Sequence, residues 1–181
     1  GAYTIQACSN GKEALIIVKE FWPDLILSDI MMPEMRGDEL CTAIKTNIET
    51  SHIPIVLLTA LNDEKNILNA LATGADGYIT KPFSIKMLKA RISNILSNRD
   101  LLRQRYAMAT KMDSEKPGLL PAEANTLDWK FITDVKNNIK NNIDNTDFTV
   151  DSLCSLHNMS RTSFYNKLKA LTGQSPADYI R

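Results

Sequence analysis

Apolar residues in the first hundred positions alternate between short unbroken runs and stretches of helical periodicity. Continuous apolar runs of this length are typical of strands buried on both faces of a parallel sheet. The runs end at proline or at polar residues and cover 24–33, 53–60 and 77–83. Helical patterns occupy about 11–20, 36–48, 63–73 and 84–97. The alternation predicts an α/β fold built from right-handed βαβ units around a parallel sheet.

The pattern is entirely helical after residue 127. A stripe of apolar residues over 128–142 predicts an amphipathic helix, and a short helix follows from Thr149 to about His157. Ser160 is placed to cap a third helix, which Gly173 ends, and Pro176 begins a fourth. A short helix, a tight connection and a second helix are the layout of a helix-turn-helix. We therefore expect a small all-α domain here.

A stretch with two prolines and a glycine separates the two patterns and reads as a linker. The expected organisation is an α/β domain at 1–98, a helical extension and linker at 99–127, and a helical domain at 128–181. The stripe of the helix at 84–97 continues through Leu102 and Tyr106. From Leu101 onward it is equally compatible with core packing and with a dimerising or signalling helix.

The composition limits the functional class. The chain has 181 residues, 44% of them hydrophobic, and a formal net charge of zero. No stretch approaches the roughly 18 apolar residues of a membrane span, so we expect this part of the protein to make no membrane contact. Three widely spaced cysteines and two histidines lack metal-ligand spacing, and reduced thiols favour a cytoplasmic location.

Three polar side chains occupy corresponding places at the ends of the predicted strands: Asp29, Thr59 and Lys81. Parallel strands bring their carboxyl ends to one edge of the sheet, where open α/β sheets bind ligands. A lone aspartate there is most simply a cap of the next turn, but an acid, a hydroxyl and a lysine together favour phosphoryl chemistry. The carboxylate would be the nucleophile, while the lysine and the hydroxyl would bind phosphoryl oxygens.

The sequence around these positions strongly resembles the receiver domain of two-component response regulators. The matching residues are Asp29, Met31, Met32, Pro33 and Gly37, then 58–60, then 74–83. The resemblance implies a flavodoxin-like fold in which a histidine kinase phosphorylates Asp29. Thr59 and Lys81 would contact the phosphoryl group, and Thr59 and Tyr78 would move together as the switch. It also implies a cis Lys81–Pro82 bond.

The same resemblance implies a magnesium site formed by Asp29 and the backbone carbonyl of Met31. Residues 2–8 and 10–15 match the second strand and second helix of the family. The first strand, its trailing acidic pair and the first helix are not in this chain, and that pair supplies magnesium ligands. Magnesium requires six oxygens in octahedral geometry, so the site is expected to be incomplete. We therefore expect the chain to be part of a longer protein.

The distribution of charged residues supports the interpretation as a helix-turn-helix. Residues 152–177 contain no acidic side chain but carry Arg161, Lys167 and Lys169. Three basic residues can equally form an ordinary solvated face. Side chains on one helix that end in hydroxyl, amide or cationic groups can nevertheless bind phosphates and base edges. The candidate DNA-binding residues are Ser160, Arg161, Thr162, Tyr165, Asn166 and Lys169. Phe164, Leu168 and Leu171 share another face and are expected to be core.

The sequence segments 159–173 and 175–181 resemble AraC-family DNA-binding domains. That family has two helix-turn-helix units joined by a long helix, and the chain includes the first unit and the start of the joining helix. By the resemblance, Thr162, Tyr165 and Asn166 fall where the family reads bases. A receiver followed by an AraC-type domain is similar to the C-terminal end of Bacteroidetes hybrid two-component proteins, in which the histidine kinase domain belongs to the same chain and the sensor can be anchored in the inner membrane.

These observations predict a phosphorelay response regulator that binds double-stranded DNA as a homodimer when Asp29 is phosphorylated, and that is not an enzyme. The alternative is a phosphorylation-independent, receiver-like interaction module tethered to DNA. A third class is a phosphatase with an aspartyl-phosphate intermediate. Such enzymes usually carry a second aspartate two residues after the nucleophile, where this chain has Met31.

Overall fold

The computed structural model describes residues 3–60, 73–111 and 125–180, with only the backbone at residues 105 and 107–111. The chain divides into two compact units, Gly1–Leu96 and Ser97–Arg181. The helix expected at 63–73 and most of the expected linker lie outside the described residues. None of the described helices is long and apolar enough to cross a membrane.

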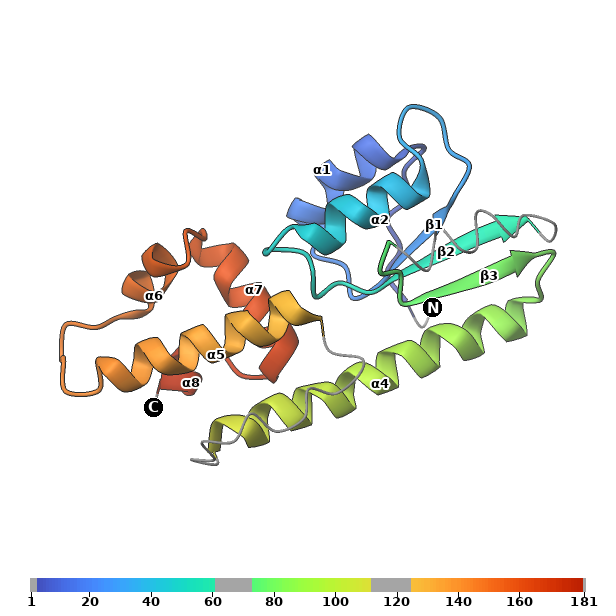
Figure 1. The fold of residues 1–181 in the computed structure, drawn as a ribbon. Coiled ribbons are helices and arrows are strands. Elements are labelled where there is room, and N and C mark those ends of the chain that lie inside the picture. The colour runs from blue at the N-terminus through green and yellow to red at the C-terminus, as the bar shows by residue number, and fades with distance from the viewer. Residues whose placement is uncertain (1–2, 61–72, 112–124, 181) are drawn as a thin grey trace. The chain divides into compact units, whose positions relative to one another are not determined.

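The first unit is a three-layer α/β structure. Three parallel strands, β1 (Ile26–Asp29), β2 (Ile55–Ala60) and β3 (Gly77–Lys81), form a sheet in the order β1-β2-β3. Helices α1 (Gly11–Phe21) and α2 (Gly37–Thr46) cover one face of the sheet, and the first half of α4 (Ile85–Lys111) covers the other (Figure 1). The α/β architecture with a parallel sheet is confirmed.

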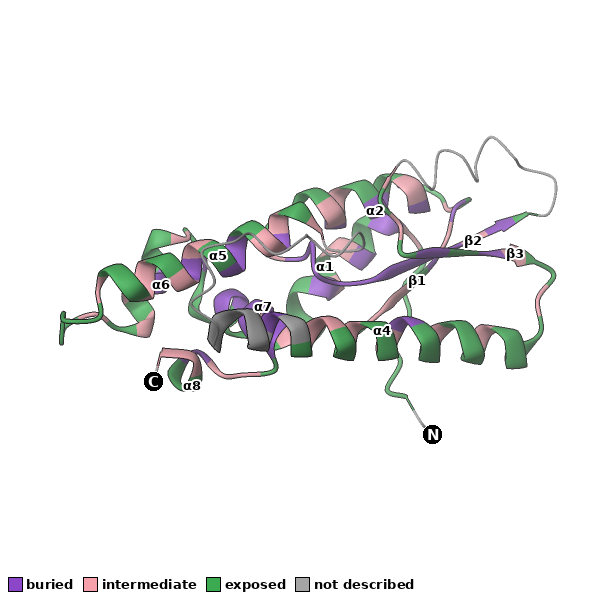
Figure 2. Ribbon diagram, turned by 60° about the horizontal axis from the view of Figure 1, so that its bottom comes forward, coloured by how far each residue is buried: buried purple, intermediate pink, exposed green. Residues whose placement is uncertain are grey.

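The central strand β2 explains why the sheet is so apolar. Its residues Ile55, Val56 and Leu57 are fully buried, and β2 is coloured as buried along most of its length (Figure 2). Ile55 and Leu57 pack with α1 and α2, whereas Val56 packs with Ile95 of α4. A strand covered on both faces has no polar side to alternate with its apolar side, so period-two patterning is absent from the sequence.

A group of polar contacts holds α2 against the end of the sheet where β2 and β3 begin. The Lys45 ammonium on α2 lies 2.7 Å from the Asp76 carboxylate and also donates to the Ile53 carbonyl at 3.0 Å. Asp76 in turn accepts a hydrogen bond from the Ile55 backbone N–H at 2.8 Å. These contacts join α2, the start of β2 and the start of β3.

The expectation that residues 2–8 form a strand is wrong for this structure. Residues 3–8 are exposed and have neither helix nor strand structure, and Asn10, two residues further on, caps α1. A strand needs a neighbour to pair its backbone N–H and C=O groups, and the described part of the chain places none beside this segment. β-type residues alone therefore do not suffice to form a strand here.

The second unit is all helical. It contains the second half of α4, then α5 (Thr126–Asn141), α6 (Val150–Leu156), α7 (Arg161–Thr172) and α8 (Pro176–Ile180). The predicted caps are present: the side chain of Thr149 accepts from Ser152 N–H, and that of Ser160 accepts from Ser163 N–H. Gly173 ends α7 with a left-handed φ of 75°, a conformation that glycine adopts without strain.

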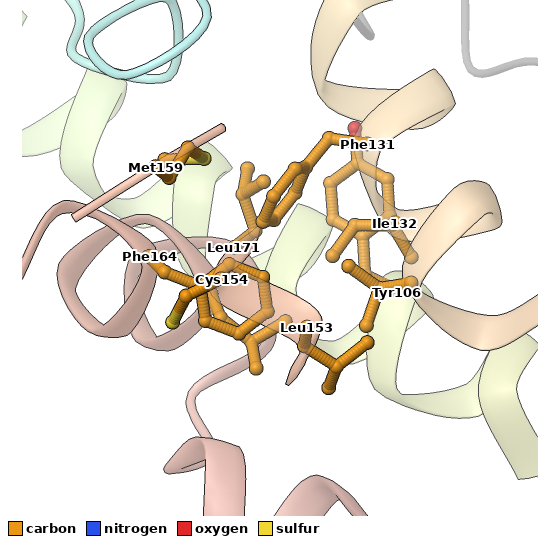
Figure 3. Close-up of a cluster of buried hydrophobic side chains, with 10 residues drawn as sticks. Tyr106, Phe131, Ile132, Leu153, Cys154, Met159, Phe164 and Leu171 are labelled. Carbon is orange, nitrogen blue, oxygen red and sulfur yellow. The ribbon is translucent and has the colours of Figure 1, made fainter. Parts of the chain in front are cut away.

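One apolar cluster holds these helices together (Figure 3). The rings of Phe131 and Phe164 meet edge to face, with centroids 5.5 Å apart. His157, at the end of α6, lies against both rings, and burial lowers its pKa despite the opposing effect of Asp134. The buried members of the cluster are Tyr106, Phe131, Ile132, Val135, Leu153, Cys154, Met159, Phe164, Leu168 and Leu171. The core assignment of Phe164, Leu168 and Leu171 is confirmed.

A buried ion pair lies beside this cluster. The Lys167 side chain on α7 is fully buried, and its ammonium lies 2.6 Å from the Asp128 carboxylate on α5 and 5.3 Å from the centre of the Phe131 ring. Burial, with the nearby Asp128 charge, raises the pKa of Tyr106 on α4 to about 12. Lys167 therefore belongs to the core and not to the basic surface that the sequence suggested.

Removing one partner of this pair is expected to destabilise the second unit strongly. Lys167→Ala leaves the Asp128 carboxylate buried without its ammonium, which costs about 3–5 kcal/mol, whereas Lys167→Met combined with Asp128→Leu costs much less. Urea unfolding followed by Trp129 fluorescence in a Trp22→Phe background measures the loss. Lys169→Ala on the exposed face of the same helix is the control, with a change within about 0.5 kcal/mol. Wild-type stability in Lys167→Ala would contradict the structural role of the pair.

Candidate functional site

Asp29 is the last residue of β1, and hydrogen bonds fix its position. The sheet continues one residue further, because Ile30 N–H donates to the Leu58 carbonyl at 3.1 Å. The Met31 backbone N–H donates to the Asp29 carboxylate at 3.2 Å, and the buried Ser28 hydroxyl donates to the Asp29 carbonyl at 3.0 Å. The carboxylate is therefore held at the carboxyl edge of the sheet, where the sequence places it.

Gly37 lies directly behind this aspartate. Its N–H donates to the Ile30 carbonyl at 3.0 Å, which brings the start of α2 back against the end of β1. A Cβ atom at Gly37 would lie 2.1 Å from the Asp29 carbonyl oxygen and 2.9 Å from the Ser28 hydroxyl. Only glycine permits this approach. The role of Ser28 was missed by sequence reasoning, and its one signal was a small polar residue inside an apolar run.

The structure brings Lys81 to Asp29. The register pairs Asp29 with Leu58 and Lys81 with Ala60, so β1 and β3 end on either side of the end of β2. The Lys81 ammonium forms an ion pair with the Asp29 carboxylate across this edge. Both side chains remain partly exposed, at 44% and 36%, so the pair is accessible from solvent. The Lys81–Pro82 peptide bond is cis, as the resemblance implies.

Thr59 on β2 and Tyr78 on β3 lie outside the ion pair. Thr59 is buried and its hydroxyl donates to the Ala60 carbonyl at 3.4 Å; within the described residues it forms no hydrogen bond with Asp29 or Lys81. Tyr78 is 39% exposed on β3, three residues before Lys81. The structure thus brings Asp29 and Lys81 into direct contact. It places Thr59 and Tyr78 on the neighbouring strands β2 and β3.

Within the described residues, the oxygen ligands near Asp29 are too few to complete a magnesium site. The described residues contain no group of three or more His, Cys, Asp or Glu side chains that could hold a metal ion. Asp29 and the Met31 carbonyl would supply two of the six oxygens that magnesium requires. Nearby on the chain, Asp38 is engaged in two hydrogen bonds from the Arg36 guanidinium, at 3.0 and 3.2 Å. We therefore derive no chemical step through a metal.

A second candidate surface lies on the exposed side of α7. Arg161, Thr162, Tyr165 and Lys169 are exposed, and Asn166 is half-buried. The Lys169 ammonium lies 5.6 Å from the centre of the Tyr165 ring, and an Arg161 guanidinium nitrogen lies 3.4 Å from the Asp151 carboxylate. The opposite side of the helix is buried. The structure therefore presents these residues together on one face.

Ser160 differs from the other predicted residues of this surface. Its hydroxyl accepts from the Ser163 backbone N–H at 3.0 Å and donates to the Ser163 hydroxyl at 2.9 Å. Ser160 is exposed, but its hydroxyl is already used in capping α7. The connection before it is equally well ordered by hydrogen bonds, since Met159 N–H donates to the Cys154 carbonyl at 3.0 Å and Met159 is buried.

Comparison with known proteins identifies the first unit. A family model for the response regulator receiver domain matches residues 1–93. A solved signal receiver domain of a signal transduction histidine kinase from Syntrophus aciditrophicus is 31% identical and has a TM-score of 0.51, over 67% of this chain and 81% of that one.

Two curated relatives differ in how much of this chain they match. Histidine kinase P4 of Formosa agariphila is 38% identical over 181 residues, which is 99% of this chain and 13% of that protein. The phosphate regulon transcriptional regulatory protein PhoB of Rhizobium meliloti is 40% identical over 94 residues, which is 52% of this chain and 41% of that protein. The chain therefore spans less than half the length of either relative.

Gly37→Ala tests whether the close approach behind Asp29 is required. The added methyl group overlaps the Asp29 carbonyl, so we expect the first unit to lose about 1–3 kcal/mol of unfolding free energy through the enforced backbone shift. Urea unfolding followed by Trp22 fluorescence in a Trp129→Phe background measures this loss. Thr42→Ala, an exposed change on the same helix, should stay within about 0.5 kcal/mol. Equal stability of Gly37→Ala and the wild type would rule out the tight contact.

Proposed function

Because the chain belongs to the family of response regulator receiver domains over residues 1–93, we propose that Asp29 accepts a phosphoryl group from a histidine kinase and that this modification controls DNA binding by the second unit. The observation that carries the proposal is the accessible ion pair between Asp29 and Lys81 at the carboxyl edge of a parallel sheet. An aspartate with a cation beside it can attack phosphorus while the cation balances the charge of the transferred group.

The transfer step is a substitution at phosphorus. An Asp29 carboxylate oxygen attacks the phosphoryl group of a phosphohistidine, a P–O bond forms, and the P–N bond breaks. The displaced imidazole leaves with the electron pair of that bond and takes up a proton from solvent. Lys81 then pairs with the phosphoryl oxygens instead of with the carboxylate alone. The match to a protein named histidine kinase along nearly the whole chain supports a kinase domain in the same polypeptide.

Phosphorylation is proposed to act through Thr59 and Tyr78. A phosphoryl group brings two negative charges and three acceptor oxygens to the edge of the sheet. The Thr59 hydroxyl, now bonded to the Ala60 carbonyl over a long 3.4 Å, would turn toward a phosphoryl oxygen. Tyr78 is partly exposed in this structure and would move inward as Thr59 leaves its place.

The second unit is proposed to bind double-stranded DNA as an AraC-type helix-turn-helix. The arrangement of α6, a tight turn and α7, with polar and basic side chains gathered on the exposed face of α7, supports this role. Thr162, Tyr165 and Asn166 would face base edges, while Arg161, Lys169 and the capped helix start at Ser160 would meet phosphates. A homodimer would then place two such helices on two half-sites.

Phosphorylation at Asp29 is tested with acetyl phosphate in magnesium buffer. We expect slow labelling of the chain, because the described residues supply few magnesium ligands, and none in Asp29→Asn, because its amide is not a nucleophile. Asp24→Asn, an exposed position before β1, is the control and should label like the wild type. Mass spectrometry of the intact protein detects the added phosphoryl group.

Label that persists in Asp29→Asn would show that another residue is the acceptor. Rapid, complete labelling would show that further acidic ligands are not needed. A chain that never labels, even with a cognate histidine kinase, favours the phosphorylation-independent interaction module.

DNA recognition is tested on duplexes selected from a random pool by the chain extended to include both helix-turn-helix units of the family. Asn166→Ala and Thr162→Ala should each cost about 1–3 kcal/mol at one base position and relax preference there. Arg161→Ala and Lys169→Ala should weaken all duplexes alike and flatten the salt dependence. Lys130→Ala, exposed on α5, is the control. The recognition-helix assignment fails if Asn166→Ala and Thr162→Ala leave affinity and base preference unchanged.

A further inference from the structure

The C-terminal turn of α7 has a backbone acceptor that the helix itself does not satisfy. A helix leaves its last four carbonyl groups without an internal partner, and Ala170 is among them because α7 ends at Thr172. The N–H groups that follow are used elsewhere: Gly173 N–H donates to the Lys169 carbonyl at 2.8 Å, and Gln174 N–H donates to the Thr172 hydroxyl at 3.2 Å.

Arg103 on α4 supplies the missing donor. Its Nε–H donates to the Ala170 carbonyl at 2.7 Å. The same guanidinium is oriented by its own helix, because Nη1 lies 3.0 Å from the Asp100 carboxylate one turn earlier. A cation at a helix C-terminus also interacts favourably with the helix dipole. The contact is thus a charged hydrogen bond with a fixed direction rather than a loose surface pair.

Apolar packing surrounds this contact within the second unit. Leu102 and Tyr106, on either side of Arg103 in the sequence, pack in the same cluster as Leu168 and Leu171 of α7. One turn earlier on α7, Lys167 is held by Asp128 of α5. The C-terminal half of α7 is therefore held from two helices, while its N-terminal half carries the exposed polar residues.

We propose that Arg103 is a positioning residue for the DNA-reading face of α7: through the Ala170 carbonyl it fixes where α7 ends and hence how Thr162 and Asn166 are presented. The inference rests on the proposed DNA binding and extends it to a residue outside the helix-turn-helix. Arg103 itself is not expected to contact a base. Helix α4 begins at Ile85, four residues after Lys81, so the residue that positions α7 lies on the helix that directly follows the phosphorylation site in the chain.

The first arm of the test measures the contact without DNA. Arg103→Met keeps an unbranched apolar chain in place of the arginine stem but removes the charge and the donor, so amide exchange at Leu171, Thr172 and Gly173 should accelerate about three- to tenfold, the equivalent of one net hydrogen bond. Arg103→Lys, which retains a charged donor, should restore most of the protection. Gln104→Ala, the exposed neighbour on α4, is the matched control and should exchange like the wild type.

The second arm measures recognition by the same variants. Each variant, made in the chain extended to both helix-turn-helix units, is tested on the duplexes that its wild-type counterpart selects from a random pool, and base preference is compared position by position. Arg103→Met should lower affinity about three- to tenfold and broaden preference at the positions read by Thr162 and Asn166, with recovery in Arg103→Lys. A purely structural role would be satisfied by the packing of methionine and would not be rescued by lysine in this way.

The outcomes separate the inference from the function on which it rests. Unchanged exchange at the end of α7 in Arg103→Met overturns the positioning role whatever the DNA result. Faster exchange with unchanged affinity and base preference also overturns it, but leaves DNA binding by the second unit intact. Selection of no duplex by the chain extended to both helix-turn-helix units refutes the proposed DNA binding, and the positioning role for DNA reading falls with it, even if the exchange arm shows the contact to be real.

Discussion

The common parallel register of three strands is the constraint on which the first unit depends. Asp29 and Lys81 are distant in the sequence, yet they meet because β1 and β3 flank β2 and end at the same edge. The register itself follows from burial: Ile55, Val56 and Leu57 are covered on both faces, so a shift of one residue would carry each of them to the wrong helix layer. The position of the Asp29–Lys81 ion pair is therefore a consequence of core packing.

A close approach between the backbone at Gly37 and the Asp29 carbonyl fixes the same edge of the sheet. The segment after β1 must turn back so that α2 can start against the Asp29 carbonyl, and only a residue without Cβ fits there. The Met31 N–H and the Ser28 hydroxyl then hold Asp29 from the turn and from the strand. The carboxylate is accessible from solvent and still fixed in direction, because the Met31 N–H of its own loop and the Lys81 ammonium of β3 both contact it.

The second unit shows how a short helix can contribute to the core on one side and carry exposed polar side chains on the other. Lys167, Phe164 and Leu168 take the inner side of α7, so its outer side is free to carry polar groups. A buried lysine is tolerated there because Asp128 and the face of Phe131 replace its hydration. The Asp128 charge also contributes to the raised pKa of Tyr106, so one carboxylate on α5 influences side chains of both α4 and α7. Polar contacts thus fix the orientation of a helix that the apolar cluster alone would leave less well specified.

The sequence by itself determined the order of the described helices and strands after Asn10, the strand-end positions of Asp29, Thr59 and Lys81, and the caps at Thr149, Ser160 and Gly173. Those features depend on local patterns and on motifs read along the chain. Only the tertiary structure decided which of the candidate residues touch. It joined Asp29 to Lys81 and kept Thr59 apart, it left residues 3–8 unpaired, and it moved Lys167 from the surface to the core. The reason is the same in each case: a side chain's environment depends on the segment packed against it, and that segment lies far away in the sequence.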